Sequence, residues 1–229
     1  MASVLARSLL DMPVKHLPEE AMIFKQMLNP SRASFSYLIC DPVTRETLLI
    51  DPDQDHCDAY LAFLNHLDLS LSYILLTRPQ EAVLGAIPRL KLKHEARVVG
   101  VDLNRSEVID LKMQPGDVLY LGEERIELLP LPQSPDAVAY RWNDRLFIGM
   151  ARARDLPDSL SGLPGETLIY PGVLLNDCWV SCVAQERESR ASCQYSELAA
   201  DKESCCAELR PDGASQETPA CRLPHMANM

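Results

Sequence analysis

The chain has 229 residues, of which 47% are hydrophobic and 24% are charged, a composition typical of a globular domain with a substantial core. Its net charge of −11 at pH 7 argues against nucleic acid and anionic membranes as partners, because both require a basic face. No apolar run reaches the roughly 18 residues that a membrane span needs, so the sequence predicts no transmembrane helix.

Residues 1–21 are predicted to form an N-terminal extension. The stretch Met1–Leu10 contains one basic residue and no long apolar segment, which does not fit a signal peptide. The eight cysteines of the chain are therefore expected to be free thiols in a reducing compartment. On these grounds the sequence predicts a cytoplasmic protein.

Strands and helices are predicted to alternate in the first half of the chain. Apolar stretches bounded by Asn-Pro and Asp-Pro turns are typical of strands, and apolar residues repeating at intervals of three and four are typical of helices. The expected strands are residues 22–28, 35–40, 46–50, 71–76 and 97–101, and the expected helices are residues 55–67 and 81–93.

The second half of the chain repeats this rhythm. Asn143-Asp144 marks a hairpin turn between two of its strands, and Asn176 or Asp177 is available as the N-cap of its helix. The expected strands are residues 118–121, 125–131, 137–142, 145–148 and 167–170, and the expected helix is residues 178–190. Two such halves predict an α/β fold in which two mixed sheets face each other and helices cover the outside, a four-layer αββα sandwich.

Residues 191–229 differ in character from the rest. Serine, glutamate, alanine, proline and cysteine dominate, and the apolar periodicity stops, so we expect a disordered tail. The tail contains four cysteines without a C-x-x-C spacing, namely Cys193, Cys205, Cys206 and Cys221. We favour a tail whose cysteines have no specific function. A tail that senses redox state or carries a persulfide is the alternative.

Several short motifs, in order along residues 22–190, point to one family. They are M-I-F-K-Q at 22–26, F-S-Y-L-I at 35–39, L-I-D-P at 49–52, N-D-R-L-F-I-G at 143–149 and I-Y-P-G at 169–172. The pattern resembles the metallo-β-lactamase superfamily, and within it the persulfide dioxygenase and glyoxalase II-like branch. The resemblance implies the same four-layer sandwich over residues 22–190 and a role in sulfur metabolism.

The resemblance also implies seven metal-ligand positions, and none of them holds a family ligand. Where the family has T-H-x-H-x-D-H after a buried strand, this chain has T-R-P-Q-E-A-V at residues 77–83. The positions fall on Arg78, Gln80, Ala82, Val83, Gln133, Met150 and Val173. Arginine is a permanent cation, and alanine and valine have no polar side-chain atom, so the donor set of a metal centre is missing. We expect no metal, no other cofactor and no catalytic residue at these positions, which would instead line a vestigial cleft.

Replacement ligands are not evident elsewhere in the sequence. No two of the five histidines stand at ligand spacing, and none lies in the motif loops. Cys178 and Cys182 are four residues apart on the expected helix 178–190, where they are predicted to pack as small apolar residues, although a redox role at the cleft rim stays open. Arg78 and Glu81 are expected to form a salt bridge across the cleft.

The sequence therefore predicts a pseudoenzyme, a non-catalytic protein with a binding or regulatory role and no metal. The candidate partners are another protein, a second copy in a homodimer, and a small thiol or anionic ligand in a slightly cationic cleft. The alternative is an active metal-dependent persulfide dioxygenase, or a thioester or other hydrolase, that uses unorthodox ligands. The two predicted functions use the same fold and differ in whether the cleft binds a metal ion.

Overall fold

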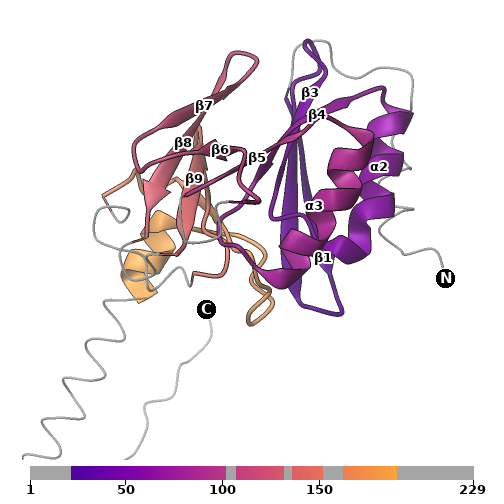
Figure 1. The fold of residues 1–229 in the computed structure, drawn as a ribbon. Helices are drawn as coiled ribbons and strands as arrows, with labels where there is room; N and C mark the ends of the chain where they lie inside the picture. Colours follow the sequence, from indigo (N-terminus) through magenta and orange to yellow (C-terminus); the bar gives the residue numbers. More distant parts are fainter. Residues whose placement is uncertain (1–21, 102–106, 132–135, 152–161, 190–229) are drawn as a thin grey trace, which may run out of the picture. The chain divides into compact units, whose positions relative to one another are not determined.

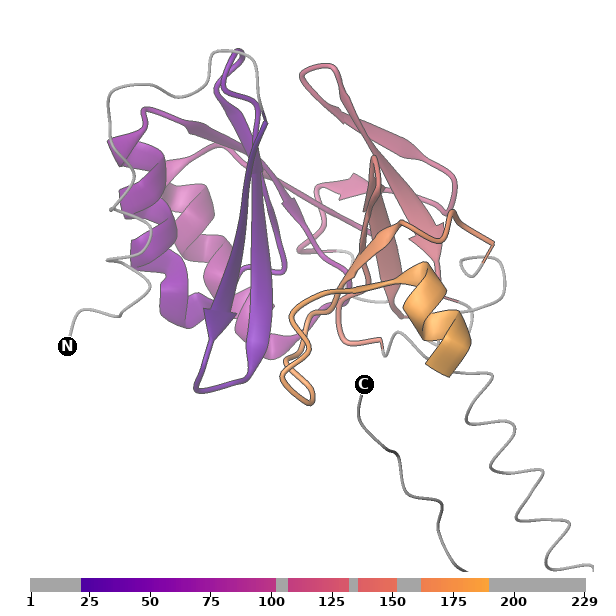
Figure 2. The same cartoon turned by 180° about the vertical axis from the view of Figure 1, so that it is seen from behind.

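The computed structural model of the chain describes residues 22–101, 107–131, 136–151 and 162–189. These residues form two six-stranded sheets, shown from opposite sides in Figures 1 and 2. The N-terminal extension, the loop with Gln133 and the cysteine-containing tail lie outside the described residues. The domain boundaries at residues 22 and 190 accordingly stay predictions.

The first sheet takes its strands in sequence order. They are β1 (Ile23–Asn29), β2 (Ser34–Cys40), β3 (Glu46–Ile50), β4 (Ser70–Leu75), β5 (Arg97–Gly100) and β6 (Leu111–Lys112). Strands β1 to β3 pair antiparallel, and β3 to β6 pair parallel. The parallel part needs crossover helices, which bring the ends of β3 and β4 to the same edge of the sheet.

The second sheet has the order β12-β11-β10-β9-β8-β7. Its strands are β7 (Val118–Leu121), β8 (Glu124–Pro130), β9 (Val138–Trp142), β10 (Arg145–Phe147), β11 (Leu168–Tyr170) and β12 (Ser181–Cys182). All neighbours are antiparallel except β10 and β11, which are parallel. The expected hairpin turn joins β9 to β10, and Asn143 in this turn has a positive φ of 53°, which asparagine tolerates well.

Three buried apolar clusters separate four layers. On β2, Leu38 belongs to the cluster under the helices, whereas its neighbours Tyr37 and Ile39 belong to the cluster between the sheets. The second sheet alternates in the same way, because Phe147 faces the first sheet and Leu146 packs in a third cluster with Val183. This period of two is the signature of strands buried on both faces. The four-layer αββα sandwich predicted from the sequence is confirmed.

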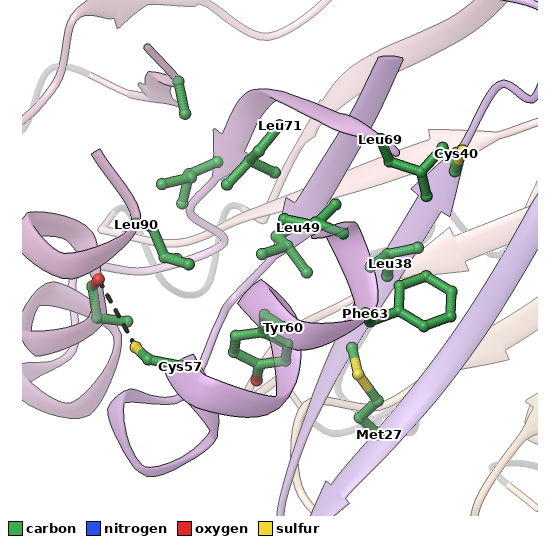
Figure 3. Packing of buried hydrophobic residues seen from close by; sticks show 14 of the residues in the cluster. Met27, Leu38, Cys40, Leu49, Cys57, Tyr60, Phe63, Leu69, Leu71 and Leu90 are labelled. Carbon is green, nitrogen blue, oxygen red and sulfur yellow. Dashed lines mark hydrogen bonds between the residues drawn. The ribbon is translucent and has the colours of Figure 1, made fainter. Parts of the chain in front are cut away.

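Two helices cover the outer face of the first sheet. Helix α2 (Cys57–His66) follows the short 3₁₀ turn η1 (Gln54–His56), and α3 (Glu81–Lys93) follows β4. Figure 3 shows Tyr60 and Phe63 of α2 among Leu38, Leu49 and Met27 of the sheet. None of the helices in the described part of the chain has the length and apolar content that a membrane crossing requires.

The helix expected at residues 178–190 is wrong at its start. Residues 181–182 form β12, which pairs with β11, and helical residues begin only at Val183. Asn176 and Asp177 both have positive φ angles, 50° and 55°, whereas an N-cap residue is extended. Cys178 and Cys182 therefore do not share a helix face, and the argument that paired them does not hold.

Two leucines of the helical layer test which side chains belong to the hydrophobic core. Leu64 of α2 is fully buried, and Leu92 of α3 is 83% exposed. Truncating a buried leucine leaves a cavity, so Leu64→Ala is expected to lower the free energy of unfolding by about 2–5 kcal/mol, and the matched Leu92→Ala by less than about 0.5 kcal/mol. Urea denaturation followed by circular dichroism measures both. Equal effects of the two changes would contradict the layer assignment.

Candidate functional site

A cavity of about 230 Å³ lies where strands of the two sheets end. On the first sheet, Asp51 directly follows β3 and Gln80 lies in the loop after β4, while Met150 and Val173 follow β10 and β11 of the second. Both strand pairs are parallel, so the loops that follow them meet at one place. This is the position at which open and mixed α/β sheets commonly bind ligands.

Five of the positions singled out in the sequence line this cavity. They are Gln80, Ala82, Val83, Met150 and Val173. Two others do not take part in its described lining: Arg78 is directed to Asp136, and Gln133 lies outside the described residues. The sequence motif thus located a real concavity, although its role as a binding site stays a prediction.

Two glycines bring Met150 and Val173 together. The backbone N–H of Gly172 donates to the carbonyl oxygen of Gly149 at 2.5 Å, and a Cβ on Gly172 would lie 2.5 Å from the carbonyl carbon of Gly149. Any other side chain at Gly172 would have to displace that backbone. The carbonyl of Gly172 also accepts a hydrogen bond from Phe35 N at 2.9 Å, which ties the second sheet to the start of β2.

Asp51 is a buried carboxylate on the cavity wall. Its Oδ1 accepts a hydrogen bond from the backbone N–H of Thr77 at 2.8 Å, and its Oδ2 accepts one from the Thr77 hydroxyl. Burial raises the pKa of Asp51 to about 6, and the two hydrogen bonds from Thr77 limit that rise. With φ of 46°, Asp51 also occupies a conformation that aspartate and asparagine accept more readily than most residues.

Asp53 is the second carboxylate of the cavity, and it serves the backbone. Its Oδ1 accepts from Asp55 N at 2.9 Å and so caps the turn η1, while Ser34 donates to Oδ2 at 3.2 Å. The Nε of Arg32 lies 3.5 Å from Asp53 Oδ2 and 3.1 Å from Asp55 Oδ2. These bonds hold the turns after β1 and β3 against each other.

The charge of the cleft differs from the expected one. Asp51 and Asp53 line the cavity, and Arg32 is the cation among its described lining residues. Arg78, which was expected to make the cleft cationic, is 2.5 Å from Asp136, with both side chains about 40% exposed. The expected bridge from Arg78 to Glu81 is thus replaced by a pair with a residue far along the chain.

A metal ion does not fit the residues that stand at the family's ligand positions. Ala82 and Val83 offer no donor atom, and Met150 offers only a thioether. Among the described residues, no three histidine, cysteine, aspartate or glutamate side chains come together as a metal site would require. The described histidines His56, His66 and His94 line neither this cavity nor the one beside it.

Sequence reasoning missed the polar half of this cavity. In that reasoning Asp51 appeared only as part of the L-I-D-P motif, and Asp53, Arg32 and Ser34 were not singled out. The available signal was the place of Asp51 directly after the buried strand β3, whose parallel neighbour β4 leads to the motif loop. Arg32 and Ser34 reach the same edge of the sheet through the turn between β1 and β2, which no motif marks.

The titration of Asp51 makes the stability of the protein depend on pH. Because its pKa is raised in the folded state, the protonated form favours folding, and this contribution is lost as the pH rises from about 4 to about 6. The difference in free energy of unfolding between the wild type and Asp51→Asn should therefore shift by about 2 kcal/mol in favour of the variant between pH 4 and pH 7. Urea titrations of both proteins in the same buffers cancel the other carboxylates. A difference that stays constant with pH would contradict this assignment.

Comparison with known proteins supports the fold and the branch named from the motifs. No protein-family model matches the chain. The human mitochondrial persulfide dioxygenase ETHE1 is 26% identical over 188 residues, which span 72% of this chain and 74% of that protein. A hydroxyacylglutathione hydrolase of Mesorhizobium japonicum is 30% identical over 101 residues, or 43% of this chain and 39% of that one.

Solved structures give the same answer. ETHE1 from Myxococcus xanthus superimposes with a TM-score of 0.66 at 29% identity, over 74% of this chain and 83% of that protein. A metallo-beta-lactamase from Staphylococcus aureus superimposes with a TM-score of 0.63 at 20% identity, over 74% of this chain and 62% of that protein. At this low identity the similarity supports the fold alone. The chain has the metallo-β-lactamase fold, and its similarity to persulfide dioxygenases and to a hydroxyacylglutathione hydrolase supports the persulfide dioxygenase and glyoxalase II-like branch.

Proposed function

We propose that this protein is a non-catalytic member of its branch, a pseudoenzyme whose cleft has a binding or regulatory role without a metal ion. The observation that carries the proposal is the pair Ala82 and Val83, which line the cavity from the first turn of α3. An alkyl side chain excludes both the lone pair and the water molecule that a metal would need at that place.

The remaining lining positions point the same way. A divalent ion in such a fold gains affinity from several donors aimed at one point, and removing one of them already weakens binding strongly. Gln80 can offer a carbonyl oxygen, but Met150 and Val173 add only apolar surface on the side of the second sheet. One replacement can be compensated by a neighbour, whereas replacement on both sides of the cleft removes the coordination sphere.

Electrostatics supports the proposal independently. Arg78 adds a permanent positive charge at the first motif position, and Asp136 neutralises it at 2.5 Å. Asp51 is satisfied by Thr77, and Asp53 by Ser34, Asp55 and Arg32. The carboxylates near the cleft therefore have protein partners, so that none of them needs a cation to be stable.

The proposed role of the protein is to bind a partner, and experiments can identify that partner. A second copy of the chain, another protein, or a small thiol or anion remain the proposed partners, in the cytoplasm. An anion would have to compete with Asp53 and Asp55 for Arg32, which makes a neutral thiol the better candidate of the two small ligands.

The alternative function is a metal-dependent persulfide dioxygenase or hydrolase with unorthodox ligands. Its support is the similarity to persulfide dioxygenases and the presence of Asp51 and Asp53 in the cavity. It requires Asp51 to exchange its two hydrogen bonds with Thr77 for a metal, at the expense of a buried and well-satisfied arrangement.

Metal content decides between the two functions. The full-length protein, purified and then loaded anaerobically with iron(II) or zinc(II), is expected to retain less than about one tenth of an equivalent after gel filtration, because it lacks the donors. Inductively coupled plasma mass spectrometry measures the metal, and circular dichroism verifies the fold. A metallo-β-lactamase-fold enzyme with an intact T-H-x-H-x-D-H motif, treated in parallel, checks the loading.

A chain with restored ligands is the matched control for this experiment. It carries the changes Arg78→His, Gln80→His, Ala82→Asp, Val83→His, Gln133→His, Met150→Asp and Val173→His, and it is expected to take up metal where the wild type does not. One equivalent of metal in the wild-type protein would overturn the proposal, and persulfide-dependent oxygen consumption would then be measured.

A further inference from the structure

A second and larger cavity lies beside the cleft, on the side of the second sheet. Its volume is about 390 Å³, within the range of small-molecule sites. Met150 and Val173 belong to the walls of both cavities, whereas Ala151, Leu175 and Cys178 belong only to the larger one. The larger cavity therefore adjoins the family's metal positions and shares two of them, Met150 and Val173.

The walls of the larger cavity combine apolar and polar side chains, and two of the apolar ones are well exposed. Met150 and Leu175 are 50% and 48% exposed, and both line the cavity. Trp179 and Val180, which follow in the same loop, are also among the most exposed large apolar residues of the described chain. Exposed apolar residues in the wall of a cavity, here Met150 and Leu175, are typical of a surface that a ligand covers.

One polar side chain in the wall of this cavity, that of Ser181, makes no side-chain hydrogen bond to a described residue. Ser181 of β12 is only 7% exposed and lines the cavity, yet its hydroxyl makes no hydrogen bond to any described residue, although backbone pairing with Ile169 fixes its place in the sheet. The enclosed side-chain atoms without a partner in the described residues are Thr47 Oγ1 and Arg145 Nε, so the Ser181 hydroxyl is open to the cavity. The Ser181 hydroxyl is thus free for a molecule inside the cavity.

The charge of the lining restricts what that molecule can be. Glu186, on the helix at residues 183–189, is the charged residue among the described lining residues, and no arginine, lysine or histidine accompanies it there. It forms no salt bridge with a described residue. An anionic ligand would meet an uncompensated carboxylate in a partly dry site, whereas a cation or a neutral donor would be attracted to it.

We infer that the larger cavity is a binding site for a compact ligand with an apolar body and a neutral or positively charged polar end. The apolar body covers Met150 and Leu175, and the polar end bonds to the Ser181 hydroxyl and the Glu186 carboxylate. The inference goes beyond the proposed function and shares with it the apolar residues Met150 and Val173. Metal content tests the proposed function, and probe binding tests this site.

Three probes with one apolar body test this inference. They are 2-phenylethylamine, 2-phenylethanol and phenylacetate, which carry a cationic, a neutral and an anionic end. Isothermal titration calorimetry on the full-length protein is expected to show binding of the amine and the alcohol, with phenylacetate at least about tenfold weaker. Equal binding of all three, or binding of the anion alone, would refute the proposed ligand class.

Cys178 reports where the probes bind. Its thiol lies in the wall of the larger cavity, and Cys182, which is also partly exposed, does not. The amine and the alcohol should slow the alkylation of Cys178 by iodoacetamide at least about threefold at saturation and leave that of Cys182 unchanged, as read by peptide mass spectrometry. Binding without selective protection of Cys178 would place the ligand elsewhere and overturn the inference.

Two variants separate the polar contacts from the fold. Ser181→Ala should weaken the amine and the alcohol by about fivefold, since each loses one hydrogen bond, while Glu186→Gln should weaken only the amine, by a similar factor. Glu188→Gln removes the same charge from the same helix at a residue outside the lining, and it should leave all affinities unchanged. Thermal unfolding of each variant checks the fold. Unaltered affinities in both Ser181→Ala and Glu186→Gln would exclude this site.

Discussion

Thr77 is the residue through which the two halves of this sandwich hold each other. Its backbone N–H and hydroxyl bind Asp51 at the end of β3, and its carbonyl accepts from Val138 N of β9 at 2.8 Å. A Cβ on Gly149 would lie 2.1 Å from the Thr77 hydroxyl oxygen, so the turn after β10 approaches as closely as glycine allows. One side chain thereby fixes the ends of strands from both sheets, and with them the walls of the cleft.

This arrangement explains how the scaffold can persist without the family's donors. In many metal proteins the ion supplies part of the folding free energy, because it gathers ligands that would otherwise repel one another. Here the buried Asp51 is satisfied by Thr77, and Gly149 and Gly172 are joined by a backbone hydrogen bond. The geometry of the cleft rests on backbone and hydroxyl contacts, so it does not require a cation at its centre.

The sequence predicted the structure best where residues close together in the sequence determine the secondary structure. The alternation of Leu38 with Tyr37 and Ile39 directly encodes a strand buried on both faces, and helix α3 begins and ends where its periodicity does. The motif order placed Gln80, Ala82, Val83, Met150 and Val173 around one cavity, because strand ends in a parallel pair must meet.

The predictions failed where contacts between residues far apart in the sequence determine the local structure. The pairing of Arg78 with Asp136 depends on the return of the chain through β9, which no local pattern near Arg78 reveals. Residues 178–182 contain no strong helix former, and the edge of β11 takes Ser181 and Cys182 as a strand. The strand partner that decides this pairing lies at residues 168–169, outside the local pattern.

The two cavities are linked by the residues that replaced the expected ligands. Met150 and Val173 face both of them, and methionine is the apolar side chain that adapts most easily to a change on either side. In a metal-bearing relative, ligands at these positions would have to stay fixed in direction, and the wall between the cavities would be rigid. Apolar replacements remove that constraint and leave the glycine contact behind them intact. Under the proposed function this wall is a deformable apolar surface, which suits the recognition of a small molecule better than the chemistry of a metal centre.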